Sequence, residues 1–161
     1  MVRELEPGLF EIDLRFQGVS GVIAAYLVAG REGLTVIETG PTTTVDRLLD
    51  GIRLAGFDPE QVTQFVVTHI HLDHAGAAGV LLERFPRARL YVHRIGLPHL
   101  VDPSRLLASA GRIYGEQMEA LWGEVRPCPA DRVVPLDDGD LIAAGDRTLR
   151  ALATPGHASH H

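Results

Sequence analysis

The sequence predicts a mixed α/β fold with a mixed, mainly antiparallel sheet and helices on its outer face. Residues 9–16 alternate apolar and polar side chains, which is typical of a half-buried strand. Residues 22–28 form a continuous apolar run, which indicates a strand buried on both faces. Apolar side chains recur at helical spacing between residues 45 and 52. Because 161 residues suit one hydrophobic core, we expect a single domain over residues 1–161.

The other strands are predicted from alternating or continuous apolar residues and from turn residues between them. A turn after residues 22–28 leads into a third strand, so that the first three strands form a meander. Pro135 cannot donate to a central ladder, which predicts that its strand lies at an edge of the sheet. The further predicted strands are residues 34–38, 64–68, 88–93, 133–136, 141–142 and 148–152.

Helices are expected in the segments between these strands. The threonine hydroxyls of residues 42–44 are expected to cap the helix that ends near Gly56. A single helical turn is expected at residues 58–60, with proline in its first turn. A helix of small residues is expected from Ala75, with its N-terminus toward a histidine-rich loop. A longer helix, capped by a serine and weakened by glycines, is expected at residues 104–125 as core or lid packing.

Bulk composition excludes several classes of protein. The formal net charge of −6 argues against a nucleic-acid partner, which requires a basic surface. No apolar run approaches the roughly 20 residues of a membrane span. The first residues lack the pattern of a signal peptide. The single cysteine, Cys128, fits a reducing compartment, so we expect a cytoplasmic protein without an internal disulfide.

Four potential metal ligands lie within six residues, directly after an apolar run. His69 and His71 are two residues apart at the end of a predicted strand, so their side chains share one side. Asp73 and His74 follow where the chain turns, and they are placed to face a second ion. Nitrogen and carboxylate ligands suit zinc, manganese or iron. The alternative is a histidine-rich surface loop without a ligand.

Residues 68–76, Thr-His-Ile-His-Leu-Asp-His-Ala-Gly, resemble the signature of the metallo-β-lactamase superfamily, and most closely that of its glyoxalase II-like metallohydrolases. Residues 154–157, Thr-Pro-Gly-His, resemble the next ligand motif of that family. The resemblance implies the N-terminal half of a metallo-β-lactamase αββα sandwich. In the family a bridging aspartate and a last histidine follow, so we expect a domain truncated after its third ligand motif.

The same resemblance implies a two-metal site in the full fold. It places His69, His71 and His157 on one ion, and Asp73 and His74 on a second. The expected cofactor is Zn²⁺, with iron or manganese as alternatives. Asp73 is also the expected catalytic residue, because it orients a water and passes a proton to the leaving group. In this chain we expect one ion to bind well and the second to bind weakly.

Two classes of function remain open from the sequence. The first is a hydrolase that uses a metal-activated water on a thioester, a lactone or another ester of a small-molecule substrate. An iron persulfide dioxygenase and a zinc nuclease are lesser variants of this reading. The second is a non-catalytic metal-binding half-fold, or a truncated product that needs a partner. The sheet face that the missing half covers in the family is expected to favour association, including a homo-oligomer.

Four further side chains have open roles. Glu38 stands where family members often carry an aspartate. Its extra methylene leaves open whether it bonds to the metal loop, residues 68–76. His93 ends a predicted strand and is either a cleft residue or an ordinary surface histidine. His161 is either a group behind the ligands or part of a frayed end, and His160 departs from the glycine that the family often has.

Overall fold

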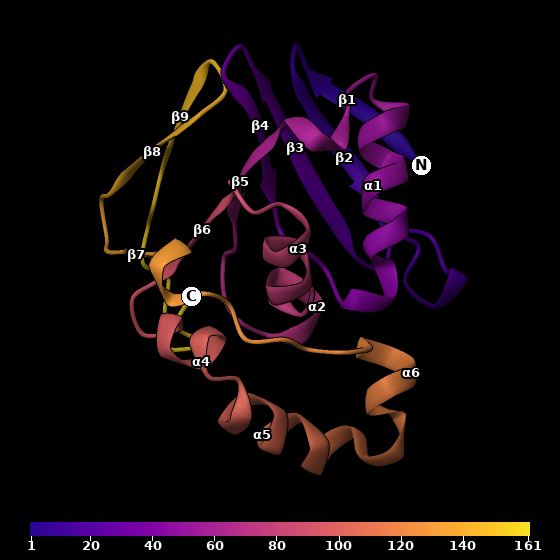
Figure 1. Cartoon of the computed structure of the whole chain (residues 1–161), viewed down its shortest axis with the longest axis vertical. Helices are drawn as coiled ribbons and strands as arrows, with labels where there is room; N and C mark the ends of the chain where they lie inside the picture. Colours follow the sequence, from indigo (N-terminus) through magenta and orange to yellow (C-terminus); the bar gives the residue numbers. More distant parts are fainter.

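The structure, a computed structural model, describes residues 1–161 and is organised around a seven-stranded sheet (Figure 1). Its strands lie side by side in chain order. Neighbouring strands are antiparallel from the first to the fourth and parallel from the fourth to the seventh. The strands are β1 (Val2–Glu6), β2 (Leu9–Asp13), β3 (Ala24–Gly30), β4 (Gly33–Ile37), β5 (Val62–Val66), β6 (Arg89–His93) and β7 (Val133–Leu136).

The mixed sheet predicted from the sequence is confirmed, including the antiparallel meander of β2, β3 and β4. β7 is an edge strand, as Pro135 predicted. β1 was not predicted, because four of its five residues are exposed and leave little apolar pattern to read. Antiparallel pairings outnumber parallel ones only when a separate hairpin is included, which pairs β8 (Leu141–Ala144) with β9 (Arg147–Arg150).

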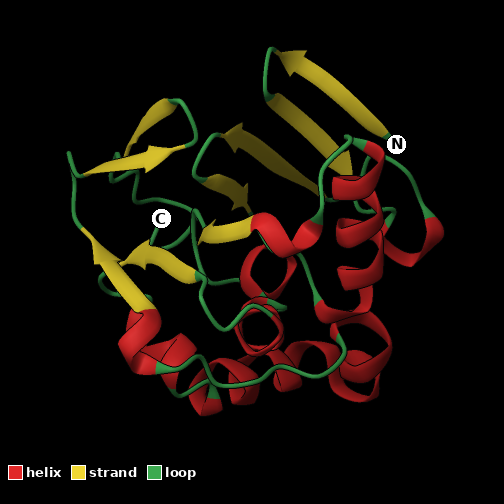
Figure 2. Cartoon of the chain, turned by 45° about the horizontal axis from the view of Figure 1, so that its top comes forward, coloured by secondary structure: helices red, strands yellow, loops and turns green.

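Helices gather on one side of the large sheet (Figure 2). Leu48 and Ile52 of α1 and Leu81 of α3 belong to the core cluster formed with the buried face of the sheet. A Cβ atom on Gly51 would lie 2.3 Å from Ile12 Cγ2, so glycine allows α1 to rest directly on β2. No helix has the combination of length and apolar character needed to cross a membrane. The α-helices are α1 (Val45–Leu54), α2 (Leu72–Ala75), α3 (Ala78–Arg84), α4 (Leu97–Val101), α5 (Ser104–Tyr114) and α6 (Met118–Trp122).

Several predicted helix details are wrong. None of the three threonine hydroxyls caps α1; Thr42 and Thr43 instead donate to carbonyl oxygens of Glu124 and Leu121 at 2.7 and 2.8 Å. These bonds fasten α6 and the segment after it to the turn before α1. At α5 the side chain of Asp102 accepts from the backbone N–H of Ser104, so the serine hydroxyl is not the cap.

The long predicted helix is a broken arm of α5, a 3₁₀ turn and α6, and the break falls at Gly115, as its glycines predicted. Trp122, only 6% exposed, stacks on Phe16 with ring centroids 5.4 Å apart. Leu72, between two of the candidate ligands, belongs to the same small apolar cluster. The arm is therefore core packing that supports the metal loop from outside the sheet.

The β8–β9 hairpin lies apart from the helices and contacts the C-terminal end of β3 (Figure 1). Its turn touches the large sheet backbone to backbone, since a Cβ atom on Gly30 would lie 2.0 Å from Gly145 Cα. Arg147 of β9 forms an ion pair of 2.7 Å with Glu6, the last residue of β1. These contacts fix the hairpin from which the chain continues to its last motif.

Candidate metal centre

The metal loop begins where β5 ends at Val66, and α2 begins at Leu72, inside the motif. The helix predicted from Ala75 is thus two shorter helices, and the first starts earlier than expected. The backbone carbonyl of His74 accepts from the N–H groups of Thr39 and Gly40 at 2.8 and 3.2 Å. The segment that follows β4 therefore holds the loop from behind.

Three of the five predicted metal ligands converge. One ligand atom from each of His69, His71 and His157 lies within 4.8 Å of the other two. The ring centroids are 4.7 to 4.9 Å apart. His71 Nδ1 and His157 Nε2 share a hydrogen bond of 3.0 Å. The structure thus brings together residues that are 86 positions apart in the sequence.

His69 has the environment of a metal ligand. Its side chain is 2% exposed, and its buried Nε2 has no hydrogen-bond partner. Its other nitrogen, Nδ1, shares a hydrogen bond of 2.9 Å with the Thr68 hydroxyl, which fixes the ring. Burial and the neighbouring histidines lower the pKa of His69 to about 3, so the imidazole is neutral and able to bind a cation. The donor set fits a divalent metal ion.

Asp73 and His74 lie beside this group but are paired with each other. Asp73 Oδ2 is 3.3 Å from His74 Nε2. Burial opposes the charge on His74, but Asp73 and Glu38 outweigh it and raise the pKa of His74 to about 9. The same partnership outweighs burial at Asp73 and keeps the pKa of that carboxyl below its usual value. Neither residue belongs to the converging set of three ligands.

Glu38 does bond to the metal loop, which the sequence left open. Its Oε1 accepts from the backbone N–H of Thr68 at 3.3 Å, and its Oε2 lies 3.4 Å from His74 Nδ1. The side chain is 6% exposed. Its backbone has φ of +66°, a left-handed conformation unusual for a residue other than glycine. Glu38 therefore acts as a buried clamp between the end of β4 and both ends of the ligand motif.

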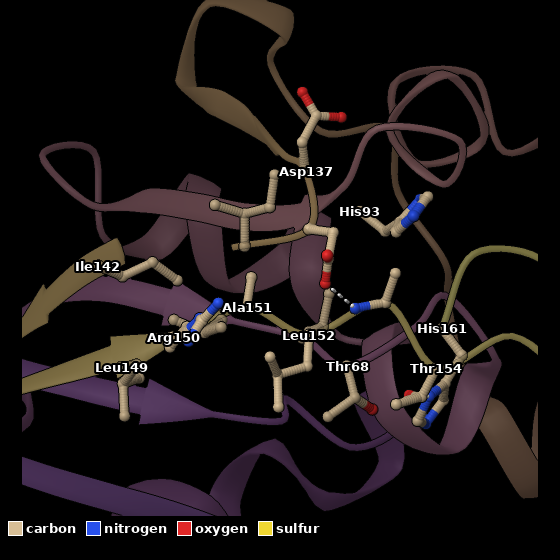
Figure 3. A pocket seen from close by; sticks show the side chains of 15 residues that line it. Thr68, His93, Asp137, Ile142, Leu149, Arg150, Ala151, Leu152, Thr154 and His161 are labelled. Carbon is tan, nitrogen blue, oxygen red and sulfur yellow. Dashed lines mark hydrogen bonds between the residues drawn. The ribbon is translucent and has the colours of Figure 1, made fainter. Parts of the chain in front are cut away.

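A cavity of about 360 Å³ adjoins the histidines on the hairpin side (Figure 3). Apolar side chains from the strands β5, β7, β8 and β9 and from the segment after β9 line about half of it. Thr68, Thr154 and His161 stand together at one end of it. His161 Nδ1 shares a hydrogen bond of 2.7 Å with the Thr154 hydroxyl. His93 also lines the cavity, and its Nδ1 accepts from Ile95 N–H at 3.1 Å. Sequence reasoning did not single out Thr68 or Thr154 as supporting groups, although each directly adjoins or opens a ligand motif.

The fold and the histidine cluster together define an α/β scaffold with a candidate metal centre, and comparison with known families agrees. Residues 19–161 match the model of the metallo-β-lactamase superfamily, so the chain belongs to that superfamily. Solved structures of subclass B3 metallo-β-lactamases share the fold. BJP-1 of Bradyrhizobium japonicum has a TM-score of 0.73 and 25% identity over 99% of this chain and 53% of its own. Another, described as having an active-site glutamic acid, has a TM-score of 0.75 and 20% identity.

Curated relatives carry several activities in their names. The chain is 34% identical over 119 residues to the N-acyl homoserine lactonase AttM of Agrobacterium fabrum, covering 70% of this chain and 39% of that protein. It is 30% identical over 125 residues to the hydroxyacylglutathione hydrolase of Rhodopseudomonas palustris, covering 76% and 37%. The chain thus spans about half or less of the length of the relatives it matches.

Proposed function

We propose that this chain is the metal-binding part of a hydrolase that cleaves a thioester, a lactone or another ester of a small-molecule substrate. The observation that carries the proposal is the convergence of nitrogen atoms from His69, His71 and His157 within 4.8 Å. Relatives named N-acyl homoserine lactonase and hydroxyacylglutathione hydrolase support hydrolysis at an acyl group. The net charge of −6 disfavours the nuclease variant.

The proposed metal is zinc, held by the three histidines. Three protein nitrogens with one open position form a catalytic zinc arrangement. Sites for iron and manganese contain more oxygen ligands than this set of three histidines. When bound, the ion supplies an activated water and polarises the substrate carbonyl. The buried Nε2 of His69 lacks any protein partner, which supports its assignment as a ligand. The free, buried Cys128 fits the reducing conditions of the cytoplasm.

Asp73 is the proposed acid–base residue. The His74 contact keeps the pKa of Asp73 low despite burial, so the carboxylate is ionised at neutral pH and accepts a proton from the attacking water. That proton then passes to the leaving oxygen or sulfur as the acyl bond breaks. His74 orients the carboxylate through the 3.3 Å contact between its Nε2 and Asp73 Oδ2. Because these two residues already pair, we propose that a second ion binds weakly.

A non-catalytic metal-binding half-fold is the second candidate. It is supported by the convergence of His69, His71 and His157, because these three residues suffice to hold an ion without any catalytic group. Such a chain would bind the ion through the same histidines and would need a partner for turnover. The two candidates share a metal site and differ in hydrolysis.

The test is zinc content and hydrolysis of the same preparation. The chain is loaded with zinc, dialysed and assayed for metal per chain, and then for cleavage of an acyl homoserine lactone and an acylglutathione thioester. We expect one tightly held ion, lost in His71→Ala and kept in His99→Ala, a matched histidine on α4. Cleavage that disappears with the ion supports the hydrolase. Bound zinc without cleavage of either substrate supports the half-fold, and no bound zinc contradicts both.

A further inference from the structure

Residues 154–161 form a closed loop that carries the third ligand, His157. The backbone N–H of Thr154 donates to the carbonyl oxygen of His161 at 3.0 Å, and the Thr154 hydroxyl shares a hydrogen bond of 2.7 Å with His161 Nδ1. The same two residues are therefore joined twice, once through the backbone and once through their side chains. The loop is thus closed at its base, although it contains no helix or strand.

The interior of the loop lacks backbone support of its own. No backbone group of residues 155–160 takes part in a backbone–backbone hydrogen bond. The residue before the loop, Ala153, is fixed where its N–H donates to Asp138 Oδ1 at 2.9 Å. The order of the loop therefore depends on the pair of residues at its base and on the 3.0 Å contact that its ligand makes with His71.

His161 also adjoins the first ligand. The centroid of its ring lies 5.0 Å from that of His69 and 6.3 Å from that of His157. Its half-buried side chain stands at the end of the cavity where Thr68 and Thr154 also lie (Figure 3). His161 does not belong to the set of three converging ligands. It is thus placed between the metal loop and the base of the loop that carries the third ligand.

We propose that His161 is a positioning residue, which closes the loop at Thr154 and so holds His157 toward the ion. This inference rests on the proposed function, because it assumes an ion bound by His69, His71 and His157. A ligand loop that is closed before binding loses less conformational freedom when the ion binds, so the ion binds more tightly. The Thr154 hydroxyl has the complementary role, because it fixes the orientation of the His161 ring at Nδ1.

The test measures zinc affinity by chelator competition in the full chain, with each side of the bond changed in turn. Thr154→Val removes the hydroxyl, and His161→Phe keeps an aromatic ring without its nitrogen atoms. We expect each variant to bind zinc about 3- to 10-fold more weakly, which is the effect of one hydrogen bond. The double variant should bind no more weakly than either single variant, because both changes remove the same bond. Ser159→Ala is the matched control, because it removes an exposed hydroxyl from the same loop and should leave the affinity unchanged.

His161→Asn separates positioning from ligation. The asparagine side chain places a polar atom where the imidazole has Nδ1, so it keeps the bond to Thr154 without supplying an imidazole ligand. We expect His161→Asn to bind zinc more tightly than His161→Phe, and X-ray absorption to count the same number of imidazoles in wild type and in both variants. Equal losses of affinity in the two variants would overturn the proposal, and a lost imidazole in both would identify His161 as a ligand instead. Unchanged affinity in Thr154→Val and His161→Phe would overturn it as well.

His71→Ala distinguishes failure of this inference from failure of the proposed function. If zinc binding depends on His71 but not on Thr154 or His161, only the positioning role is wrong. If His71→Ala retains zinc at wild-type affinity, the ion is not held at this cluster, and both the metal site and the positioning role are wrong.

Discussion

The candidate centre joins two regions that differ in how firmly they hold their ligands. His69 and His71 follow the buried strand β5, and Glu38, Thr39 and Gly40 fasten the loop from behind. His157 lies on an exposed irregular segment after β9, which is fixed by a few bonds such as Ala153 N–H to Asp138 Oδ1 at 2.9 Å. The contrast is between a pair of ligands on a firmly held element and a third ligand on an exposed segment with fewer anchoring bonds, and we expect the third ligand to gain order as the ion binds.

The largest expected effect follows from replacing a ligand on the rigid side. His69→Ala should abolish tight zinc binding, because it removes a preorganised donor and leaves two histidines. His157→Ala should weaken zinc binding by a smaller factor. The variant loses one metal–nitrogen bond, but it also avoids the conformational entropy cost of ordering the segment that carries His157. Calorimetric titration with zinc measures both. Equal losses in the two variants would show that the two regions are equally preorganised.

The clamp at Glu38 should give an intermediate effect. Glu38→Ala leaves the Thr68 N–H without its acceptor and His74 without its buried counter-charge, so we expect about 1–3 kcal/mol of lost stability. Zinc affinity should fall about 10- to 100-fold, as for other groups that orient ligands. Glu38→Gln keeps an acceptor for the Thr68 N–H and should lose less stability and less zinc affinity than Glu38→Ala. Urea denaturation and zinc titration give the values, and an unchanged affinity in Glu38→Ala would show that the loop holds its shape alone.

The last expected effect is the pH dependence of stability in the metal-free chain. The pKa of His69 is lowered from 6.5 to about 3, so the unfolded chain binds the proton first and stability falls as pH drops below 6.5. The pKa of His74 is raised from 6.5 to about 9, so its contribution is present below 6.5 and disappears as pH rises toward 9. We expect stability to peak near pH 6.5.

Denaturation of chelator-treated protein from pH 4 to pH 10 checks this profile. His74→Ala should flatten the alkaline side, and His69→Ala should flatten the acid side. If neither variant changes its own side of the profile, other groups control the pH dependence.

Local patterns predicted most of the fold and the ligand motifs. The alternation at residues 9–16 and the buried run at 22–28 correspond to β2 and β3, because period and burial are local properties of strands. β1 lacked such a pattern because it is mostly exposed. The start of α2 at Leu72 was missed because the motif resembles a loop, whereas Leu72 belongs to a tertiary cluster that includes Trp122.

Partners distant in the sequence were not predictable in the same way. The family resemblance grouped His69, His71 and His157, and the structure brings them together. No sequence pattern predicts that Asp73 and His74 face each other, or that Glu38 reaches Thr68 with a left-handed backbone. Such pairings depend on side-chain direction at the ends of separate elements, and a spacing rule carries no information about it.

The close approach of Gly145 to Gly30 has a consequence for the third ligand. It anchors the β8–β9 hairpin, and Ala151 and Ala153 are hydrogen-bonded to the turn before that hairpin. His157 is therefore joined to a fixed part of the chain by residues 154–156, which span about 10 Å when extended. For a tethered ligand of this kind, binding strength depends on effective concentration, which is set by the length and stiffness of the tether and by the position of its anchor. The glycine contact thus contributes to the effective concentration of the His157 imidazole at the ion, although neither glycine lies in the metal centre.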